Sequence, residues 1–200
     1  WDLRGAVDRR NSELAWGART CDFETLAKAR SSAFAPLNAP DIRAERYARC
    51  QRALDGLGRA FEDAAPDALL IVGDDHHEWF MQDIQPAFSI FHGQALLNRA
   101  LTDEEMKRQE SLGLSYAAQI YYPERDEIYD CPSELATHLV RQAIADDFDV
   151  TACAQQPADA GLPRRLGHSF GFIYRRILKR RRPPLIPVMV NTYYPPNQPS

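Results

Sequence analysis

One short segment of the sequence gathers most of the residue types that could bind a metal ion. Residues 73–80 read Gly-Asp-Asp-His-His-Glu-Trp-Phe and follow directly on the apolar run 68–72. A short apolar run of this kind is typical of a strand buried on both faces. Ligand sites in α/β sheets collect at the carboxyl ends of strands, so imidazole and carboxylate groups here could hold a divalent metal. The alternative is a solvated acidic turn in which one histidine only makes a hydrogen bond.

A second histidine stands in a different setting. His168 lies between Gly167 and Ser169, in what we interpret as a small glycine-flanked turn. A histidine that substrate can reach titrates near neutral pH and can serve as a general acid or base. A purely structural histidine is the alternative. For His92 and His138 we predict structural roles, because His138 falls within a predicted helix and no acid neighbours His92.

The elements that must position these residues alternate between helices and strands. After Asp41, the apolar residues Tyr47, Cys50, Leu54, Leu57 and Phe61 recur every three or four positions, which predicts a helix with one buried face. Further helices are predicted over 22–30, from a capping box at 102–105, and from 133 onward. Strands are predicted over 68–73, 87–91, 148–153 and 187–191. We therefore predict an α/β fold with a central mixed or partly parallel sheet flanked by helices, in a single domain over residues 1–200 with 1–40 as a lead-in.

The charge distribution and the apolar runs of the sequence disfavour nucleic-acid-binding and membrane-spanning proteins. The net charge is −4, yet residues 160–200 contain eight basic residues and no acid. The 164–182 basic region could contact RNA, but no aromatic residue interrupts residues 179–182, so the sequence disfavours nucleic acid. The sequence has no apolar run long enough to cross a membrane and no CxxC pair, and we expect no signal peptide. We predict a cytoplasmic protein that forms a homo- or hetero-oligomer.

Three motifs together resemble a known family. The stretch Gly73-Asp74-Asp75-His76, followed by Phe80 and by 86–88 (Pro-Ala-Phe), is similar to the class III extradiol dioxygenases, the group of protocatechuate 4,5-dioxygenase catalytic subunits. That family also has a His-Ser or His-Gly turn resembling 167–170 and an apolar strand ending in asparagine resembling 187–191. The resemblance covers roughly residues 67–198.

The resemblance implies an enzyme that cleaves a catechol-type ring with O2 at a mononuclear, non-haem Fe(II) site. It makes His76 a metal ligand, or His77 if the register is shifted by one residue. Asp75 would fix the orientation of the ligating histidine through a hydrogen bond. His168 would be the catalytic acid and base, and Asn191 would lie on the active-site floor and bind substrate.

The sequence departs from the family pattern at both ends. The family places a second histidine ligand before the position of Trp1 and a glutamate ligand after that of Ser200, so we expect the natural protein to extend beyond both termini. Residues 193–200 are predicted to be a loop. Two other functions stay open: a non-catalytic partner subunit with the same fold and no complete metal site, and an RNA-binding module that uses the 164–182 basic region.

Overall fold

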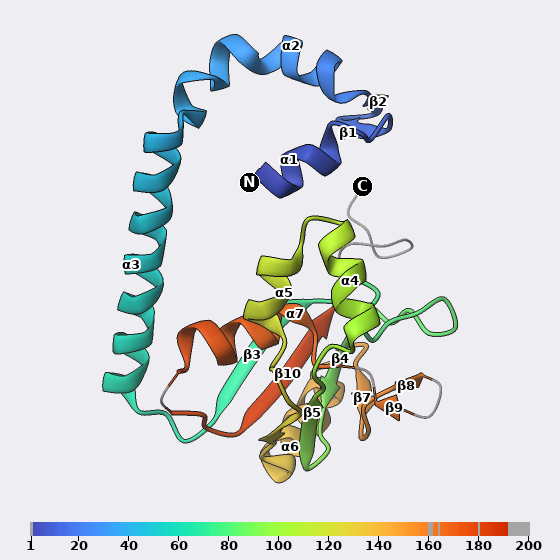
Figure 1. The fold of residues 1–200 in the computed structure, drawn as a ribbon. Helices are drawn as coiled ribbons and strands as arrows, with labels where there is room; N and C mark the ends of the chain where they lie inside the picture. Colours follow the sequence, from blue (N-terminus) through green and yellow to red (C-terminus); the bar gives the residue numbers. More distant parts are fainter. Residues whose placement is uncertain (1, 160–161, 164, 180, 192–200) are drawn as a thin grey trace. The chain divides into compact units, whose positions relative to one another are not determined.

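The computed structural model describes residues 2–159, 162–163, 165–179 and 181–191 (Figure 1). Contacts within the chain divide it into two compact units. Unit 1 comprises residues 1–57 and 102–118, and unit 2 comprises 58–101 and 119–200. Whether the two units form one domain stays a prediction, and the predicted loop at 193–200 lies outside the described residues.

Unit 1 is mostly helical. Its elements are α1 (Asp2–Asp8), β1 (Leu14–Trp16), β2 (Arg19–Cys21), α2 (Phe23–Phe34), the 3-10 turn η1 (Pro36–Asn38), most of α3 (Pro40–Ala64), α4 (Asp103–Ser111) and the start of α5 (Ser115–Tyr121). The antiparallel strands β1 and β2 meet at a turn where Gly17 has a φ of 61°, a conformation that favours glycine. The predicted capping box is confirmed, since the Thr102 hydroxyl accepts from the Glu105 N–H and Glu105 accepts from the Thr102 N–H.

The long helix α3 confirms one prediction and corrects another. It spans Pro40–Ala64, as the three-and-four spacing of its apolar residues predicts. The predicted buried face is wrong, because α3 contains no buried residue, and Tyr47 and Leu57 are 49% and 55% exposed. Periodicity predicts which residues share a face of the helix, but it cannot supply the layer that would cover that face.

Unit 2 is built on a four-stranded mixed sheet. Its strand order is β3 (Leu69–Asp74), β10 (Leu185–Val190), β4 (Phe88–Phe91) and β7 (Thr151–Cys153). The β3–β10 and β4–β7 pairs are parallel and the β10–β4 pair is antiparallel. Helix α7 (His168–Phe172) packs against β3, and α6 (Ser133–Ala145) packs against β4. The predicted α/β class, a mixed sheet flanked by helices, is confirmed.

The remaining elements of unit 2 are short. They are the antiparallel pair β5 (Ala95–Asn98) and β6 (Glu127–Asp130), the antiparallel pair β8 (Ala158–Asp159) and β9 (Leu162–Pro163), and the π-helix η2 (Ile173–Ile177), which continues α7. Two local predictions need correction. Residues 167–172 are not a glycine-flanked turn, because His168 is the first residue of α7. The predicted strand 148–153 is shorter, since only Thr151–Cys153 pair with β4.

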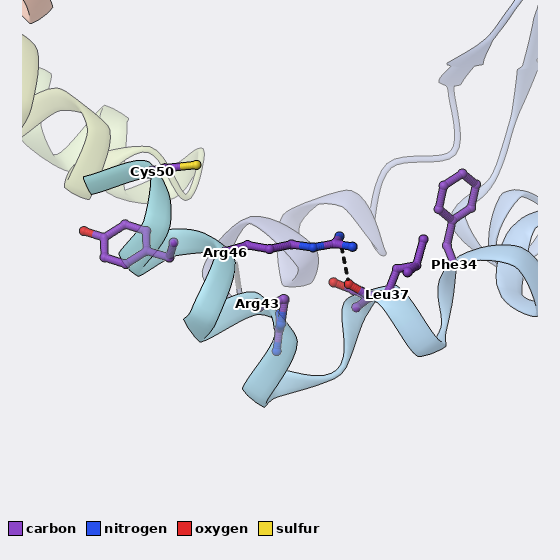
Figure 2. Close-up of a pocket in the computed structure, with 7 residues that line it drawn as sticks. Phe34, Leu37, Arg43, Arg46 and Cys50 are labelled. Atoms are coloured by element: carbon purple, nitrogen blue, oxygen red, sulfur yellow. Dashed lines mark hydrogen bonds between the residues drawn. The ribbon is translucent and has the colours of Figure 1, made fainter. Parts of the chain in front are cut away.

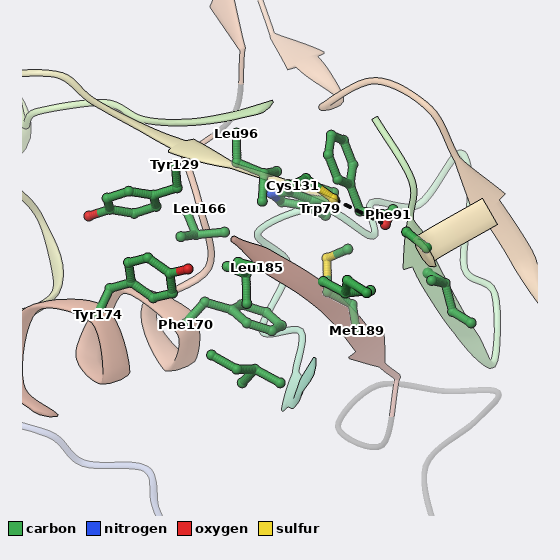
Figure 3. Packing of buried hydrophobic residues seen from close by; sticks show 14 of the residues in the cluster. Trp79, Phe91, Leu96, Tyr129, Cys131, Leu166, Phe170, Tyr174, Leu185 and Met189 are labelled. Atoms are coloured by element: carbon green, nitrogen blue, oxygen red, sulfur yellow. Dashed lines mark hydrogen bonds between the residues drawn. The ribbon is translucent and has the colours of Figure 1, made fainter. Parts of the chain in front are cut away.

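A hydrophobic core fills unit 2 (Figure 3). Sheet residues such as Phe91, Leu185 and Met189 are at most 1% exposed and cluster with Phe170 and Tyr174 from the α7–η2 segment. The Tyr174 ring lies against that of Tyr129, with the ring centroids 4.4 Å apart. This core fixes the position of α7 relative to β3, and with it the relation between the two histidine motifs.

Candidate active site

The loop after β3 is folded around a buried carboxylate. Asp75 is 3% exposed; its Oδ1 accepts from the Trp79 N–H at 2.7 Å, and its Oδ2 accepts from the Glu78 and Phe80 N–H groups at 3.2 and 3.1 Å. Burial raises the pKa of Asp75, and these backbone donors act in the opposite direction. Asp75, predicted to orient a ligating histidine, thus shapes the whole loop that carries both candidate ligands.

The far end of this loop is anchored in the core. Trp79 and Phe80 are 4% and 5% exposed, and the Trp79 indole N–H donates to the Arg165 carbonyl at 2.8 Å. His76 is exposed between these fixed points, whereas His77 is half-buried and has a φ of 55°. A positive φ is uncommon for histidine and shows that the chain turns sharply there.

The contact that defines the site joins the two histidine motifs. Glu78, from the loop after β3, accepts from His168 twice: Oε1 accepts the backbone N–H at 2.8 Å, and Oε2 lies 2.9 Å from the ring Nδ1. The side chains are 30% and 18% exposed for His168 and Glu78. A Cβ at residue 167 would lie 3.0 Å from the Glu78 carboxylate, so Gly167 gives this carboxylate room to reach the helix. The structure thus brings together segments that are 90 residues apart in the sequence.

This geometry sets the state of the imidazole. A carboxylate next to Nδ1 favours the tautomer in which Nδ1 carries the hydrogen, and Nε2 is then left as the acceptor. The hydrogen bond to Glu78 is the main cause that raises the pKa of His168; burial lowers it, and the charges of Glu78, Asp75 and Asp74 raise it. His168 is therefore arranged as a base at Nε2 whose protonated form Glu78 stabilises.

Three aromatic rings surround this pair. The His76 ring centroid lies 4.9 Å from that of His168, so the predicted ligand and the predicted acid/base are neighbours. The Tyr121 ring lies edge-on at 5.5 Å from His168. Burial and, after it, the negative charge of nearby Glu78 raise the pKa of Tyr122, so its phenol stays protonated. The Arg165 guanidinium lies 5.5 Å from the centre of the Tyr122 ring.

Close backbone approach holds α7 in place. A Cβ at Gly73 would lie 2.6 Å from the Ser169 hydroxyl, and a Cβ at Gly171 would collide with the Tyr121 carbonyl. The helix that begins with His168 is therefore wedged between β3 and the end of α5. These glycines are required by contact distance, because neither has a positive φ.

Asn191, the predicted substrate-binding residue, lies at the same end of the sheet. It follows β10, whose Val190 pairs with Asp74, and its backbone N–H donates to the Ala87 carbonyl at 2.9 Å. The side chain is 3% exposed, and its Oδ1 accepts no hydrogen bond from any described residue. A buried amide oxygen without a donor is costly, and a ligand hydroxyl could supply the donor.

The metal site that the resemblance implies is not assembled by these residues. Within residues 2–159, 162–163, 165–179 and 181–191, no three His, Cys, Asp or Glu side chains gather as a metal would require. His76 has His168 as a ring neighbour, but His168 is engaged with Glu78. A stable protein site for a divalent transition metal uses three or more ligands, so the described residues do not by themselves fit Fe(II).

The 164–182 basic region is partly paired. Arg175 and Arg182 both contact the Glu127 carboxylate, at 3.4 and 3.0 Å, and Arg182 also lies over the Tyr129 ring. Helical structure ends at Ile177, so Arg181 and Arg182 follow the helix. Arg164 and Arg180 lie outside the described residues.

Sequence reasoning included Glu78 in the polar cluster 73–80 as a possible metal ligand but missed its pairing with His168, and it missed Tyr121 and Tyr122. No signal in the sequence links Glu78 to a histidine 90 residues further along the chain. Nothing in the sequence indicates the two tyrosines either, because the position of Tyr121 beside His168 and Phe172 arises from packing against α7.

Comparison with models of known protein families gives no match, and comparison with curated proteins gives none either. None of the helices in the described part of the chain is both long and apolar enough to span a membrane.

Proposed function

We propose that this chain is an extradiol ring-cleaving dioxygenase in which His168 is the acid and base and Glu78 holds it. The observation that carries the proposal is the 2.9 Å contact between His168 Nδ1 and Glu78 Oε2, beside His76 and at the carboxyl end of β3. The reaction would insert both atoms of O2 into a catechol-type ring next to its two hydroxyls.

Residues of this chain would accept and donate the protons that the reaction transfers. A substrate hydroxyl placed before His168 would give its proton to Nε2, and Glu78 would stabilise the imidazolium that forms. The imidazolium would return the proton to an oxygen atom as the ring opens. Asn191 Oδ1 would accept from the second hydroxyl, and the His168 backbone N–H would keep Glu78 in place by donating to it.

Fe(II), with His76 as one ligand and His77 as the alternative, is part of the proposal. When bound, such an ion would acidify the catechol and bring it together with O2. Cytoplasmic location and assembly into oligomers also stay proposals.

A direct test measures oxygen uptake and the absorbance of the ring-opened product. The natural full-length protein, purified and reconstituted with Fe(II) under nitrogen, would be given a panel of catechols with and without a ring carboxylate. We expect one O2 consumed per ring opened. His168→Ala should lower kcat by about 10²–10⁴-fold, whereas His138→Ala, an exposed position on α6, should leave it unchanged.

One observation favours a second candidate, a partner subunit that keeps the fold and does no chemistry. It is the lack, among described residues, of a group of three possible metal ligands. The same assay separates the two functions. A protein that retains no Fe(II) and consumes no O2 with any catechol would contradict the dioxygenase proposal and support the partner subunit.

A further inference from the structure

A stripe of apolar side chains runs along the exposed side of α3. The residues Tyr47, Cys50, Leu54 and Leu57, which we name the α3 stripe, are spaced by three, four and three positions. Tyr47, Cys50 and Leu57 are exposed and Leu54 is half-buried. The next residue in the series, Phe61, already packs against the core of unit 2. The spacing is that of a seam between two helices wound around each other, so a second helix is the natural cover.

A pocket lies beside the α3 stripe in unit 1 (Figure 2). It has a volume of about 430 Å³ and is lined by Phe34, Leu37, Asn38, Arg43, Arg46, Tyr47 and Cys50, with the Arg46 side chain reaching across toward Leu37. The Arg46 guanidinium donates to the Leu37 carbonyl at 3.2 Å, which holds the two sides together. Figure 2 shows that these walls come from α2, η1 and α3. An apolar concavity next to an apolar seam can receive a protruding side chain from the covering helix.

The charges of α3 indicate which helix fits. Residues 40–52 carry Arg43, Arg46, Arg49 and Arg52 against Asp41 and Glu45, a net charge of 4 − 2 = +2. Residues 53–64 carry Arg59 against Asp55, Glu62 and Asp63, a net charge of 1 − 3 = −2. Two copies of α3 in antiparallel orientation would set each basic half beside an acidic half, and their helix dipoles would also oppose. Parallel copies would set like charges side by side.

We propose that the α3 stripe is covered by α3 of a second copy of this chain, related by a two-fold axis and antiparallel. Centred on residue 52, this pairing places Leu57 of one copy opposite Tyr47 of the other and Cys50 opposite Leu54. Leu57, 55% exposed within one chain, then enters the pocket beside Tyr47 of the partner copy. A two-fold interface uses the same surface twice, so one stripe and one pocket on each chain are sufficient. The inference does not rest on the proposed dioxygenase function.

Light scattering coupled to size-exclusion chromatography tests the dimer. One chain has a mass of 22.7 kDa, so two have 2 × 22.7 = 45.4 kDa. We expect the wild-type chain to run as the dimer and Leu57→Glu as the monomer. Ile144→Glu, an equally exposed apolar position on α6 (58%), is the matched control and should stay dimeric. A monomeric wild type, or a dimer that Leu57→Glu leaves intact, would overturn the proposal.

A gentler variant guards against misfolding. Leu57→Ala should weaken self-association by about 100-fold or more, since the side chain is lost twice in a symmetric dimer, with an unchanged circular dichroism spectrum. An unchanged dissociation constant would contradict a role for Leu57.

Disulfide trapping tests the orientation. Tyr47→Cys and Leu57→Cys would each be made in a Cys50→Ser background, mixed under reducing conditions and then oxidised. The antiparallel pair should cross-link only in the mixture, because residues 47 and 57 lie about 15 Å apart along one helix. Cross-linking of each variant with itself would show a parallel pair and overturn the proposed entry of Leu57 into the pocket.

Discussion

The two units of the chain differ in how far their apolar residues are buried. Every residue of the hydrophobic core cluster lies in unit 2, and among the described residues of unit 1 only Ala118 is a buried hydrophobic residue. Several large apolar side chains of unit 1 are exposed to solvent over about half of their surface or more. Examples are Leu3 at 66%, Phe34 at 48% and Tyr116 at 62%. All five histidines and the whole candidate site belong to unit 2.

This difference shows that a helix and a functional site have different structural requirements. Spacing of apolar residues is enough to predict helices in both units, as α3 and α6 show. A hydrogen bond of 2.9 Å between side chains 90 residues apart needs a packed core that fixes both backbones. Unit 2 has such a core, whereas the hydrophobic core cluster includes no described residue of unit 1.

The largest expected effect on the free energy of unfolding comes from a cavity in the core of unit 2, compared with an equivalent truncation in unit 1. Leu96→Ala, at a position with 0% exposure in unit 2, should lower the free energy of unfolding by about 2–5 kcal/mol. Leu3→Ala, at 66% exposure in unit 1, should change it by less than about 0.5 kcal/mol. Urea unfolding followed by circular dichroism measures both values. Equal losses would show that unit 1 buries its apolar residues as unit 2 does.

A pair of glycine substitutions should sharpen the comparison with effects of opposite sign. Gly171→Ala forces a methyl group against the Tyr121 carbonyl, so we expect a loss of about 1–3 kcal/mol in the free energy of unfolding. Gly5→Ala, in α1, meets only the tip of Arg9 at 3.8 Å and should gain about 0.5–1 kcal/mol from helix propensity. Thermal unfolding checks both signs. A neutral Gly171→Ala would mean that α7 is not wedged against Tyr121.

The smallest effect is a pH dependence confined to unit 2. The folded pKa of His168 is raised above its ordinary value of 6.5, so its pairing with Glu78 stabilises the fold fully below that pH. This contribution is lost as the pH rises through the folded pKa. Glu78→Gln should therefore cost about 1 kcal/mol or less near pH 6, and less again near pH 9. Glu110→Gln, exposed in unit 1, should give a flat difference in unfolding free energy, and a flat difference for Glu78→Gln would contradict the pairing.

Particular residues show what local sequence can and cannot predict. The strands ending at Asp74 and Val190 were predictable because buried strands read as short apolar runs. Strand β10 begins two residues earlier than its prediction and ends one residue earlier. The start of α7 at His168 was not predictable, because Gly167 and Gly171 read as a turn until their close contacts are known. The partnership of Glu78 with His168 depends on the parallel pairing of β3 with β10 and on α7 packing against β3, both of which are long-range features. The role of Glu78 as the partner of His168 could therefore be identified only from the fold.

The most direct measurement of the central claim is the ¹⁵N spectrum of the His168 ring, recorded across a pH titration in the wild-type protein and in Glu78→Gln. The account predicts that in the neutral wild-type ring Nδ1 carries the hydrogen and Nε2 is bare, and that the pKa lies above 6.5. It predicts a lower pKa for His168 in Glu78→Gln, because the carboxylate charge that stabilises the imidazolium is gone. A neutral ring with its hydrogen on Nε2, or a pKa that Glu78→Gln leaves unchanged, would contradict the claim that Glu78 prepares His168 to accept a substrate proton.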